Sequence, residues 1–387
     1  MWRAPLRQPW VNAVWVEHLE APGQRGDVLG GEGALAALAD RLARHELGRE
    51  GLAVVDEAVG PRALAWMAER DGLCVSRLLV TGGERLKDWT MISSIYESAL
   101  RAGVARDGWL LAVGGGALSD AVGFAAATYL RGIPWAAVPT TLLAQVDAAI
   151  GGKTGINLPA GKNLVGAFHL PRIVGLDPRW TQTLPPREWR AGLGELLKTA
   201  LLMGVAEWNT LEAAPRPWEG SPAPMLAWAE QAARFKCQLV ARDPHEQGDR
   251  ILLNLGHTVG HAVEQVADYR GPSHGEAVGL GLLAALRLSE ELLGLDAVWR
   301  MRLRRVLERW GMPVRLPPRS AAALVAALAR DKKRRGGEVR WVLLRHPGEA
   351  VVRPVPGALV ATALAELEEG AAPDGGASEG ETGDGGD

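Results

Sequence analysis

The 387-residue sequence has little cysteine, no long hydrophobic run and almost no net charge. Two cysteines, Cys74 and Cys237, cannot form a disulfide framework, so we expect a reducing compartment. No apolar run approaches the roughly 20 residues that span a membrane, and residues 1–20 lack the apolar core of a signal peptide. The formal net charge of −2 gives no electrostatic reason to expect nucleic acid or an anionic membrane as partner. These absences exclude fibrous, secreted and membrane proteins and predict a cytoplasmic globular enzyme of about two domains.

Lysine and asparagine are scarce as well. Only seven of the 43 basic residues are lysines, which leaves 36 arginines, and there are only five asparagines. Chance and a GC-rich genome would produce such a bias, but they would scatter the remaining lysines. The lysines instead fall in short glycine-rich or polar segments, which indicates places where a compact ammonium fits and a flat guanidinium does not. They are Lys87, Lys153, Lys162, Lys198, Lys236, Lys332 and Lys333.

The first 180 residues alternate between strand and helix patterns. Short apolar runs predict buried strands at 52–55, 75–80, 109–113 and 135–138. Amphipathic patterns predict helices at 34–46, 62–69, 88–102 and 118–129. This alternation predicts an α/β fold with a Rossmann-like parallel sheet covered by helices. Residues 145–168, rich in glycine, lysine and asparagine, predict a long functional loop.

A break at residues 181–187, which contain Pro185 and Pro186, predicts the boundary to a mostly α-helical domain. Helical patterns follow at 188–202, 225–241, 251–266, 276–293, 298–310 and 321–330, and a strand pair at 339–344 and 350–355. The last stretch has almost no apolar bulk and predicts a disordered acidic tail. The expected units are residues 1–180, residues 181–369 and the tail 370–387.

Three adjacent glycines, Gly114, Gly115 and Gly116, follow a predicted strand and open a predicted helix. Such glycines let the backbone approach a pyrophosphate, whose charge the helix N-terminus favours. Ser119 stands where the common dinucleotide fingerprint has its third glycine, so the alternative is an ordinary tight turn. Asp56, at the end of an earlier strand, could bind a ribose hydroxyl or simply cap a helix.

The segment Gly151-Gly152-Lys153-Thr154-Gly155 is not a phosphate-binding P-loop, because the first glycine of that pattern is missing. What remains is a glycine-rich stretch beside Asp147 that carries two ammoniums and two amides, from Lys153, Asn157, Lys162 and Asn163. These groups suit an anionic, hydroxyl-rich ligand such as a sugar phosphate. The alternative is a solvated loop.

Three of the eight histidines, His257, His261 and His274, fall within 18 residues. The first two are four residues apart on an apolar helical pattern, so they share a face and could chelate zinc. Thr258 excludes the zinc-peptidase motif, which needs glutamate at that position. Glu195 is the best candidate for a further ligand, although with Lys198 on the same helix face it could also form a surface ion pair.

The order and spacing of these segments resemble the 3-dehydroquinate synthases. The resemblance covers about residues 50–355, and all seven lysines fall on its motifs. The matching segments are Gly82-Gly83-Glu84 with Lys87, 114–120, Tyr129-Leu130-Arg131-Gly132, 139–147, 151–157, Gly161-Lys162-Asn163, Glu195, Lys198, Lys236, Asp243, Arg250, 253–258 with Gly260-His261, Ser273-His274-Gly275-Glu276 and Asp331-Lys332-Lys333.

The resemblance implies a shikimate-pathway enzyme that converts 3-deoxy-D-arabino-heptulosonate 7-phosphate into 3-dehydroquinate and phosphate. The route implied is transient oxidation by NAD, phosphate elimination, re-reduction and intramolecular aldol closure. The implied cofactors are NAD and one divalent metal ion, zinc or cobalt. A homodimer is also implied, in which Arg131 reaches the phosphate site of the neighbouring subunit.

The resemblance also assigns residues. The implied metal ligands are Glu195, His257 and His274. The implied substrate-pocket residues are Asp147, Lys153, Lys162, Asn163, Lys198, Lys236, Arg250, Asn254, His261 and one of Lys332 and Lys333. The implied NAD contacts are Asp56, Glu84, Lys87, Gly114, Gly115, Gly116, Asp120, Thr140, Thr141, Lys153 and Lys162. The chain departs from the family pattern at Ser119, Leu158, Thr199 and Pro244, where glycine, histidine, tyrosine and glutamate are usual.

Three other functions compete with this one. A related sugar-phosphate cyclase, of the inosose or valiolone synthase type, would share the cofactors, but Arg250 suits a carboxylate that its substrates lack. A metal-dependent polyol dehydrogenase would release NADH and would not need so many lysines around a phosphate. An inactive binding protein would be expected to have lost one of the three metal ligands.

Overall fold

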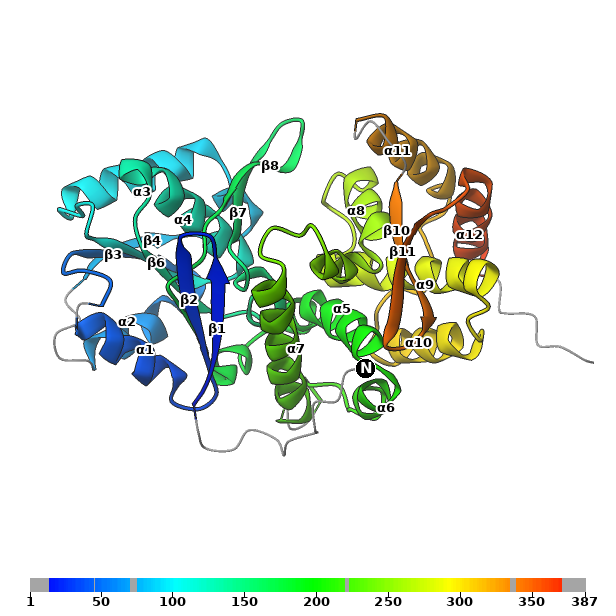
Figure 1. The fold of residues 1–387 in the computed structure, drawn as a ribbon, viewed down its shortest axis with the longest axis horizontal. Helices are drawn as coiled ribbons and strands as arrows, with labels where there is room; N and C mark the ends of the chain where they lie inside the picture. The colour runs from blue at the N-terminus through cyan, green and yellow to red at the C-terminus, as the bar shows by residue number, and fades with distance from the viewer. Residues whose placement is uncertain (1–13, 45, 70–74, 220–222, 335–338, 371–387) are drawn as a thin grey trace, which may run out of the picture.

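The computed structural model describes residues 14–44, 46–69, 75–219, 223–334 and 339–370, with only the backbone for 331–334. A half built on a seven-stranded sheet and a half built mostly of helices lie side by side along the long axis of the molecule (Figure 1). Among the described helices, none is both long and apolar enough to cross a membrane.

The large sheet is parallel except at one edge. Its strands run in the order β1-β2-β9-β6-β5-β3-β4, and only β1 and β2 pair antiparallel. In this order β4 lies on one side of β3 and β5 on the other, so the direction in which strands are added reverses between β3 and β5. Such a reversal is a topological switch point, where α/β proteins bind ligands. The strands are β1 (Trp15–Ala21), β2 (Gln24–Gly30), β3 (Gly51–Asp56), β4 (Ser76–Val80), β5 (Trp109–Gly114), β6 (Trp135–Pro139) and β9 (Ile173–Leu176).

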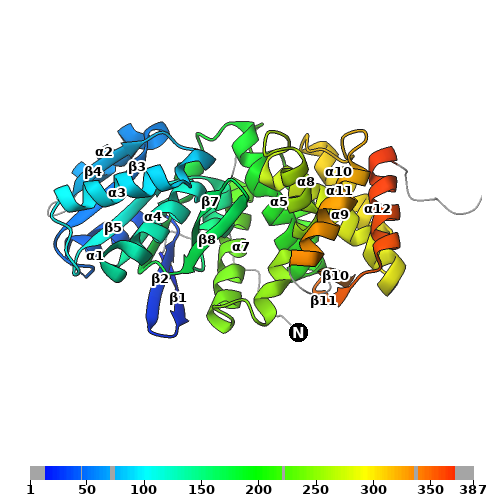
Figure 2. The same ribbon diagram turned by 90° about the horizontal axis from the view of Figure 1, so that it is seen from above.

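Helices cover both faces of this sheet because its central strands are apolar on both sides. Leu110 and Ala112 pack with α3 (Trp89–Arg101) and α4 (Gly116–Thr128), while Leu111 and Val113 pack with α1 (Ala34–Ala43) and α2 (Gly60–Ala68). The helix α7 (Ala223–Arg242) packs against the same face of the sheet as α3 and α4, and it joins the two halves, as Figure 2 shows.

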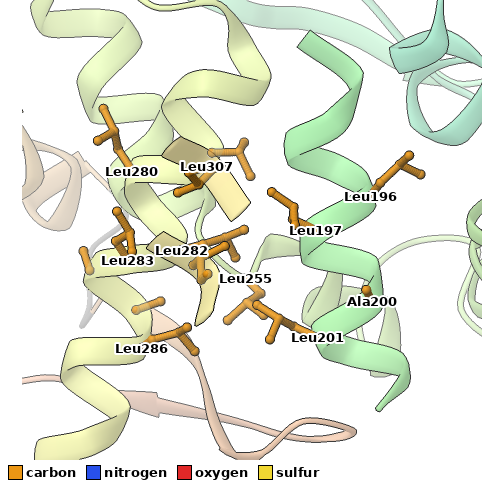
Figure 3. Close-up of a cluster of buried hydrophobic side chains, with 14 of the residues drawn as sticks. Leu196, Leu197, Ala200, Leu201, Leu255, Leu280, Leu282, Leu283, Leu286 and Leu307 are labelled. Carbon is orange, nitrogen blue, oxygen red and sulfur yellow. The ribbon is translucent and has the colours of Figure 1, made fainter. Parts of the chain in front are cut away.

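The helical half encloses a core of leucines. Leu197 and Leu201 of α5 (Pro186–Met203) point toward Leu282 of α9 (His274–Leu293), with Leu255 between them (Figure 3). The other elements around this core are α6 (Val205–Glu212), α8 (His257–Val266), α10 (Val298–Arg309), α11 (Ala321–Arg334), α12 (Gly357–Glu369) and the antiparallel pair β10 (Arg340–His346) and β11 (Glu349–Pro354).

Two glycines let α5 and α9 cross in close contact. A Cβ added to Gly194 would lie 2.2 Å from the carbonyl oxygen of Gly275, and a Cβ on Gly275 would lie 2.3 Å from that of Arg190. Only glycine fits at such a crossing, since real Cβ atoms do not approach backbone this closely. The crossing brings the residues that follow Gly194 and precede Gly275 next to each other.

The predicted α/β class and the predicted strands of the first half are confirmed. The prediction of a long loop over residues 145–168 is wrong: the chain forms a π-helical turn η4 (Ala144–Ala148) and a hairpin of β7 (Lys153–Leu158) and β8 (Gly161–Phe168). A continuous helix over 251–266 is also wrong, because Gly256 takes a φ of 79° and separates the 3-10 turn η6 (Asp249–Asn254) from α8. The predicted tail beyond Gly370 lies outside the described residues.

The crossing of α5 and α9 can be tested with Gly194→Ala. We expect the free energy of unfolding to fall by about 1–3 kcal/mol, because the added methyl group forces the two helices apart. Urea denaturation measures this change. Gly60→Ala is the matched control, since a Cβ there meets nothing within 4 Å. An unchanged stability of Gly194→Ala would show that the crossing tolerates a side chain.

Candidate active site

A carboxylate buried in the helical half is surrounded by ionisable groups. Glu195 of α5 is 1 % exposed, and its Oε1 lies 3.2 Å from His257 Nε2 and 3.0 Å from His274 Nε2. Its other oxygen contacts the ammonium of Lys198, one turn along the same helix. The three predicted metal ligands thus converge, and their ligand atoms all lie within 4.8 Å of one another.

Helix ends and glycines position the two histidines. His257 is the first residue of α8 and His274 the first of α9, where the side chains of Ser273 and Glu276 form a capping box. Because Gly281 has no side chain, the start of α8 can lie directly against α9. A Cβ on Gly281 would fall 1.9 Å from the carbonyl oxygen of Gly256. Residues from three separate helices therefore meet at fixed positions on rigid elements.

The donor set fits a divalent metal ion. Both histidines place Nε2 toward Glu195, and both have an acceptor at Nδ1: the carbonyl oxygen of Leu255 at 3.2 Å for His257, and Glu264 Oε2 at 3.3 Å for His274. Two imidazoles and a carboxylate are ligands that zinc and cobalt accept, and metal-binding histidines usually donate their second nitrogen to such acceptors.

The ionisable groups of this cluster shift one another's pKa values. Burial alone would raise the pKa of Glu195, but Lys198 and His257 hold it well below its usual range. Burial lowers the pKa of His274, but its hydrogen bonds to Glu195 and Glu264 outweigh burial and raise that pKa to about 10. Desolvation by the surrounding site and the two neighbouring histidines lower the pKa of His261 to about 3, so its imidazole, which still reaches solvent, is neutral at neutral pH.

A second cluster of cations lies where α7, η6 and the β7–β8 hairpin meet. Arg250 is 1 % exposed, and it donates to the carbonyl oxygens of Pro244 at 2.6 Å and Gly151 at 3.1 Å. Its Nε is buried and has no hydrogen-bond partner among the described residues. Lys236 donates to Asp147 Oδ1 at 2.5 Å and to its carbonyl oxygen at 2.6 Å. This buried, partly unpaired positive charge suits an anionic ligand.

Lys153 and Asn254 meet on one acid, Glu246. The Lys153 ammonium contacts Glu246 Oε2, and Asn254 Nδ2 donates to its Oε1 at 2.6 Å. Partial desolvation of this half-exposed side chain lowers the pKa of Lys153 to about 7, and Arg250 and Lys236 add to the effect. The shift is downward even though the Glu246 carboxylate lies against the same ammonium.

A network of hydrogen bonds and ion pairs links the β7–β8 hairpin to the sheet half. Lys87 is 4 % exposed; it donates to Asp120 Oδ2 at 2.5 Å and contacts Asn163 Oδ1. Burial raises the pKa of Asp120 to about 6, against the opposing effect of Lys87. Lys162 Nζ lies 3.7 Å from Glu84 Oε1 and equally far from Glu264 Oε1. The hairpin thus spans the space between the two halves.

The carboxyl ends of β3, β5 and β6 meet at the switch point of the sheet. Asp56 caps a short turn, accepting from the Ala58 amide at 3.0 Å, and Gly115 is the N-cap of α4. The Thr140 amide donates to the Gly114 carbonyl oxygen at 2.9 Å, and Thr141 Oγ1 accepts from the Ala144 amide at 3.2 Å. The helix N-terminus and a nearby carboxylate fit the pyrophosphate and ribose of a dinucleotide.

Ser119 does not disturb this turn, because its hydroxyl points to the Gly115 carbonyl oxygen at 3.4 Å. Pro244, another departure from the family pattern, still holds Arg250 through its backbone carbonyl. Three predicted site residues are not brought into these clusters by described contacts. Arg131 is exposed at the end of η3 (Tyr129–Arg131), and the side chains of Lys332 and Lys333 lie outside the described residues.

Two acids at the site were missed by the sequence analysis. Glu264 lies seven residues after His257, on the same face of α8, so its spacing was a usable signal. Glu246 carried no such signal, because it lies in an irregular turn with a φ of 57°.

Comparisons with known proteins agree with this geometry. Residues 77–191 match the family described as 3-dehydroquinate synthase N-terminal, and residues 192–334 match 3-dehydroquinate synthase C-terminal. The chain belongs to the 3-dehydroquinate synthase family. The 3-dehydroquinate synthase of Synechococcus sp. is 42 % identical over 334 residues, which are 83 % of this chain and 89 % of that protein. That of Symbiobacterium thermophilum is 40 % identical over 87 % of this chain and 96 % of its own length.

Solved structures of other sugar-phosphate cyclases share the fold. A 2-epi-5-epi-valiolone synthase from Streptomyces hygroscopicus, solved with NAD+ and Zn2+, is 30 % identical with a TM-score of 0.79, covering 96 % of this chain and all of that one. A 2-deoxy-scyllo-inosose synthase, solved with carbaglucose-6-phosphate, NAD+ and Co2+, is 24 % identical with the same TM-score, covering 91 % and 100 %. The family predicted from the motifs, and with it the prediction of an enzyme, is confirmed.

The pKa of Lys153 can be measured directly because the chain has only seven lysines. We expect acylation by acetic anhydride to follow a titration with a midpoint near 7, whereas an ordinary lysine titrates near 10.4. Mass spectrometry of peptides gives the extent at each pH. Lys198, which is 1 % exposed, should be protected until the protein is unfolded. A midpoint near 10 for Lys153 would contradict the effect of burial.

Proposed function

We propose that this chain catalyses the reaction of its family, the conversion of 3-deoxy-D-arabino-heptulosonate 7-phosphate into 3-dehydroquinate and phosphate. The observation that carries the proposal is a cluster of cations next to three convergent predicted metal ligands: Lys236 and Arg250 are buried, and Lys153 is half exposed beside them. A substrate with both a carboxylate and a phosphate needs this much positive charge, whereas a neutral polyol does not.

Two groups must be bound for this chemistry. NAD supplies a reversible hydride acceptor, and the divalent ion, zinc or cobalt, supplies a Lewis acid. Glu195, His257 and His274 hold the ion. The α4 N-terminus at Gly114–Gly116 receives the pyrophosphate of NAD, and Asp56 the ribose, with Glu84, Lys87, Asp120, Thr140 and Thr141 around them.

The cations orient the substrate. Arg250, held by two backbone carbonyls, offers a fixed guanidinium edge to the carboxylate. Lys153, Lys162 and Asn163 clamp the phosphate from the hairpin, while Lys198, Lys236, Asn254 and the neutral His261 contact hydroxyl groups. Such positioning fixes the reacting conformer before any bond changes. Lys332 or Lys333 completes the pocket.

Phosphate release tests the function. Purified protein supplied with the substrate, NAD and Co2+ should release one phosphate per 3-dehydroquinate with no net NADH, and a chelator should abolish the reaction. The absorbance of NADH is followed in the same cuvette. No phosphate release, with metal and NAD demonstrably bound, would sink the proposal and direct the search to other sugar phosphates. Accumulating NADH would indicate a polyol dehydrogenase.

We also propose that the enzyme is a homodimer in which Arg131 enters the phosphate site of the partner subunit. Two consecutive residues, Leu130 and Arg131, have left-handed backbone conformations with φ of 49° and 72°. This conformation is costly for residues with side chains, and Arg131 is exposed. A contact in the assembled enzyme would explain why the strain is kept.

Mixed dimers test the role of Arg131. Arg131→Ala and His274→Ala should each lose most activity alone. Mixed, unfolded and refolded together, they should recover about one quarter of wild-type activity, because half the dimers are mixed and each has one intact site. Phosphate release measures the recovery. If Arg131 acts within its own subunit, no mixture regains activity.

A further inference from the structure

Glu264 is buried beside Glu195, His257 and His274, the three predicted metal ligands. It is 9 % exposed and lies two turns along α8 from His257. Its Oε2 lies 3.3 Å from His274 Nδ1. Its Oε1 lies 3.7 Å from the ammonium of Lys162. The side chain therefore connects a predicted metal ligand on α9 with the hairpin that reaches the sheet half.

The contact with Glu264 determines which ring nitrogen of His274 carries the proton. A carboxylate can only accept a hydrogen bond, so Nδ1 must carry the proton. The lone pair of a neutral His274 is then on Nε2, the nitrogen that faces Glu195 at 3.0 Å. The carbonyl oxygen of Leu255 does the same for His257. Of the two acceptors, only that of His274 is a charged side chain, which strengthens the bond and makes the ligand more basic.

Lys162 keeps this carboxylate in place. Its ammonium lies over the Tyr269 ring, 4.1 Å from the centroid, and midway between Glu264 and Glu84. The positive charge favours the ionised form of Glu264 in its buried position and restrains its rotamer.

We propose that Glu264 is a positioning residue that holds His274 in the orientation and tautomer required of a metal ligand. This inference rests on the proposed function, because it assumes a metal ion at Glu195, His257 and His274. The inference goes beyond that function because it assigns a role to a residue that is not among the predicted metal ligands or substrate contacts.

The affinity of the apoprotein for Co2+ alone tests the proposal. Glu264→Gln keeps an acceptor oxygen but loses the charge, so Co2+ should bind roughly 10-fold more weakly; Glu264→Ala loses both and should bind roughly 100-fold more weakly. The visible absorption of bound Co2+ gives both the affinity and the ligand geometry. The melting temperature of metal-free Glu264→Gln should match that of the wild type.

Glu290→Gln is the matched control. Glu290 is equally buried in α9 and pairs with Arg300 at 2.7 Å, away from the metal site. The proposal would be overturned if both Glu264 variants bound Co2+ as tightly as the wild type, or if Glu290→Gln lost as much affinity as they do. It would also be overturned if the wild-type protein bound no Co2+. A wild-type protein that binds Co2+ but releases no phosphate would sink the proposed function alone and leave this comparison readable.

Discussion

The negative charge of Glu195 is the constraint on which the helical half depends. An unpaired carboxylate in such a buried position would cost several kcal/mol, so compensating groups must lie within a few ångströms. Lys198 is available on the same helix, but the two histidines must come from α8 and α9. They can approach only where no side chain separates the helices, which is why Gly194, Gly275 and Gly281 occupy the crossings. The leucines of α5 and α9 then hold this arrangement by burial (Figure 3).

The sheet half places its candidate dinucleotide site at the switch point between β3 and β5. Its glycines stand at the carboxyl ends of strands, where the helix N-terminus of α4 faces the switch point. The β7–β8 hairpin carries Lys153, Lys162 and Asn163 between the two halves, so one local element serves both. Lys162 lies between Glu84 on the sheet side and Glu264 on the metal side, which links the two sites through a single charge.

Much of this could be predicted from the sequence, for physical reasons. Strands such as 109–113 are apolar on both faces and are bounded by turns, so their pattern is unambiguous. The sequence does not predict the β1–β2 hairpin or the short β9. In β1 the apolar–polar alternation is broken, since Val16 is exposed and Glu17 half-buried, and β9 has only four residues. Glycine, lysine and asparagine are typical of loops, so the composition of residues 153–168 does not indicate the hairpin that forms there. The motifs predict Glu195, His257 and His274 as metal ligands, and the structure brings their ligand atoms together. The spacing of Glu264 from His257 places it on the same face of α8, but only the tertiary structure shows that His274 lies against it.

The scarcity of lysine now has a structural reason at three positions. Lys87, Lys198 and Lys236 are each less than 10 % exposed, and each ammonium contacts a carboxylate. A guanidinium is larger and planar and has two further nitrogens to satisfy, so it would not fit in these places. Arg250 shows the reverse case: it is also buried, but two backbone carbonyls lie where its fork can reach both. The choice between the two cations therefore follows from the acceptors around each one, which is why a sequence that elsewhere uses arginine keeps its lysines here.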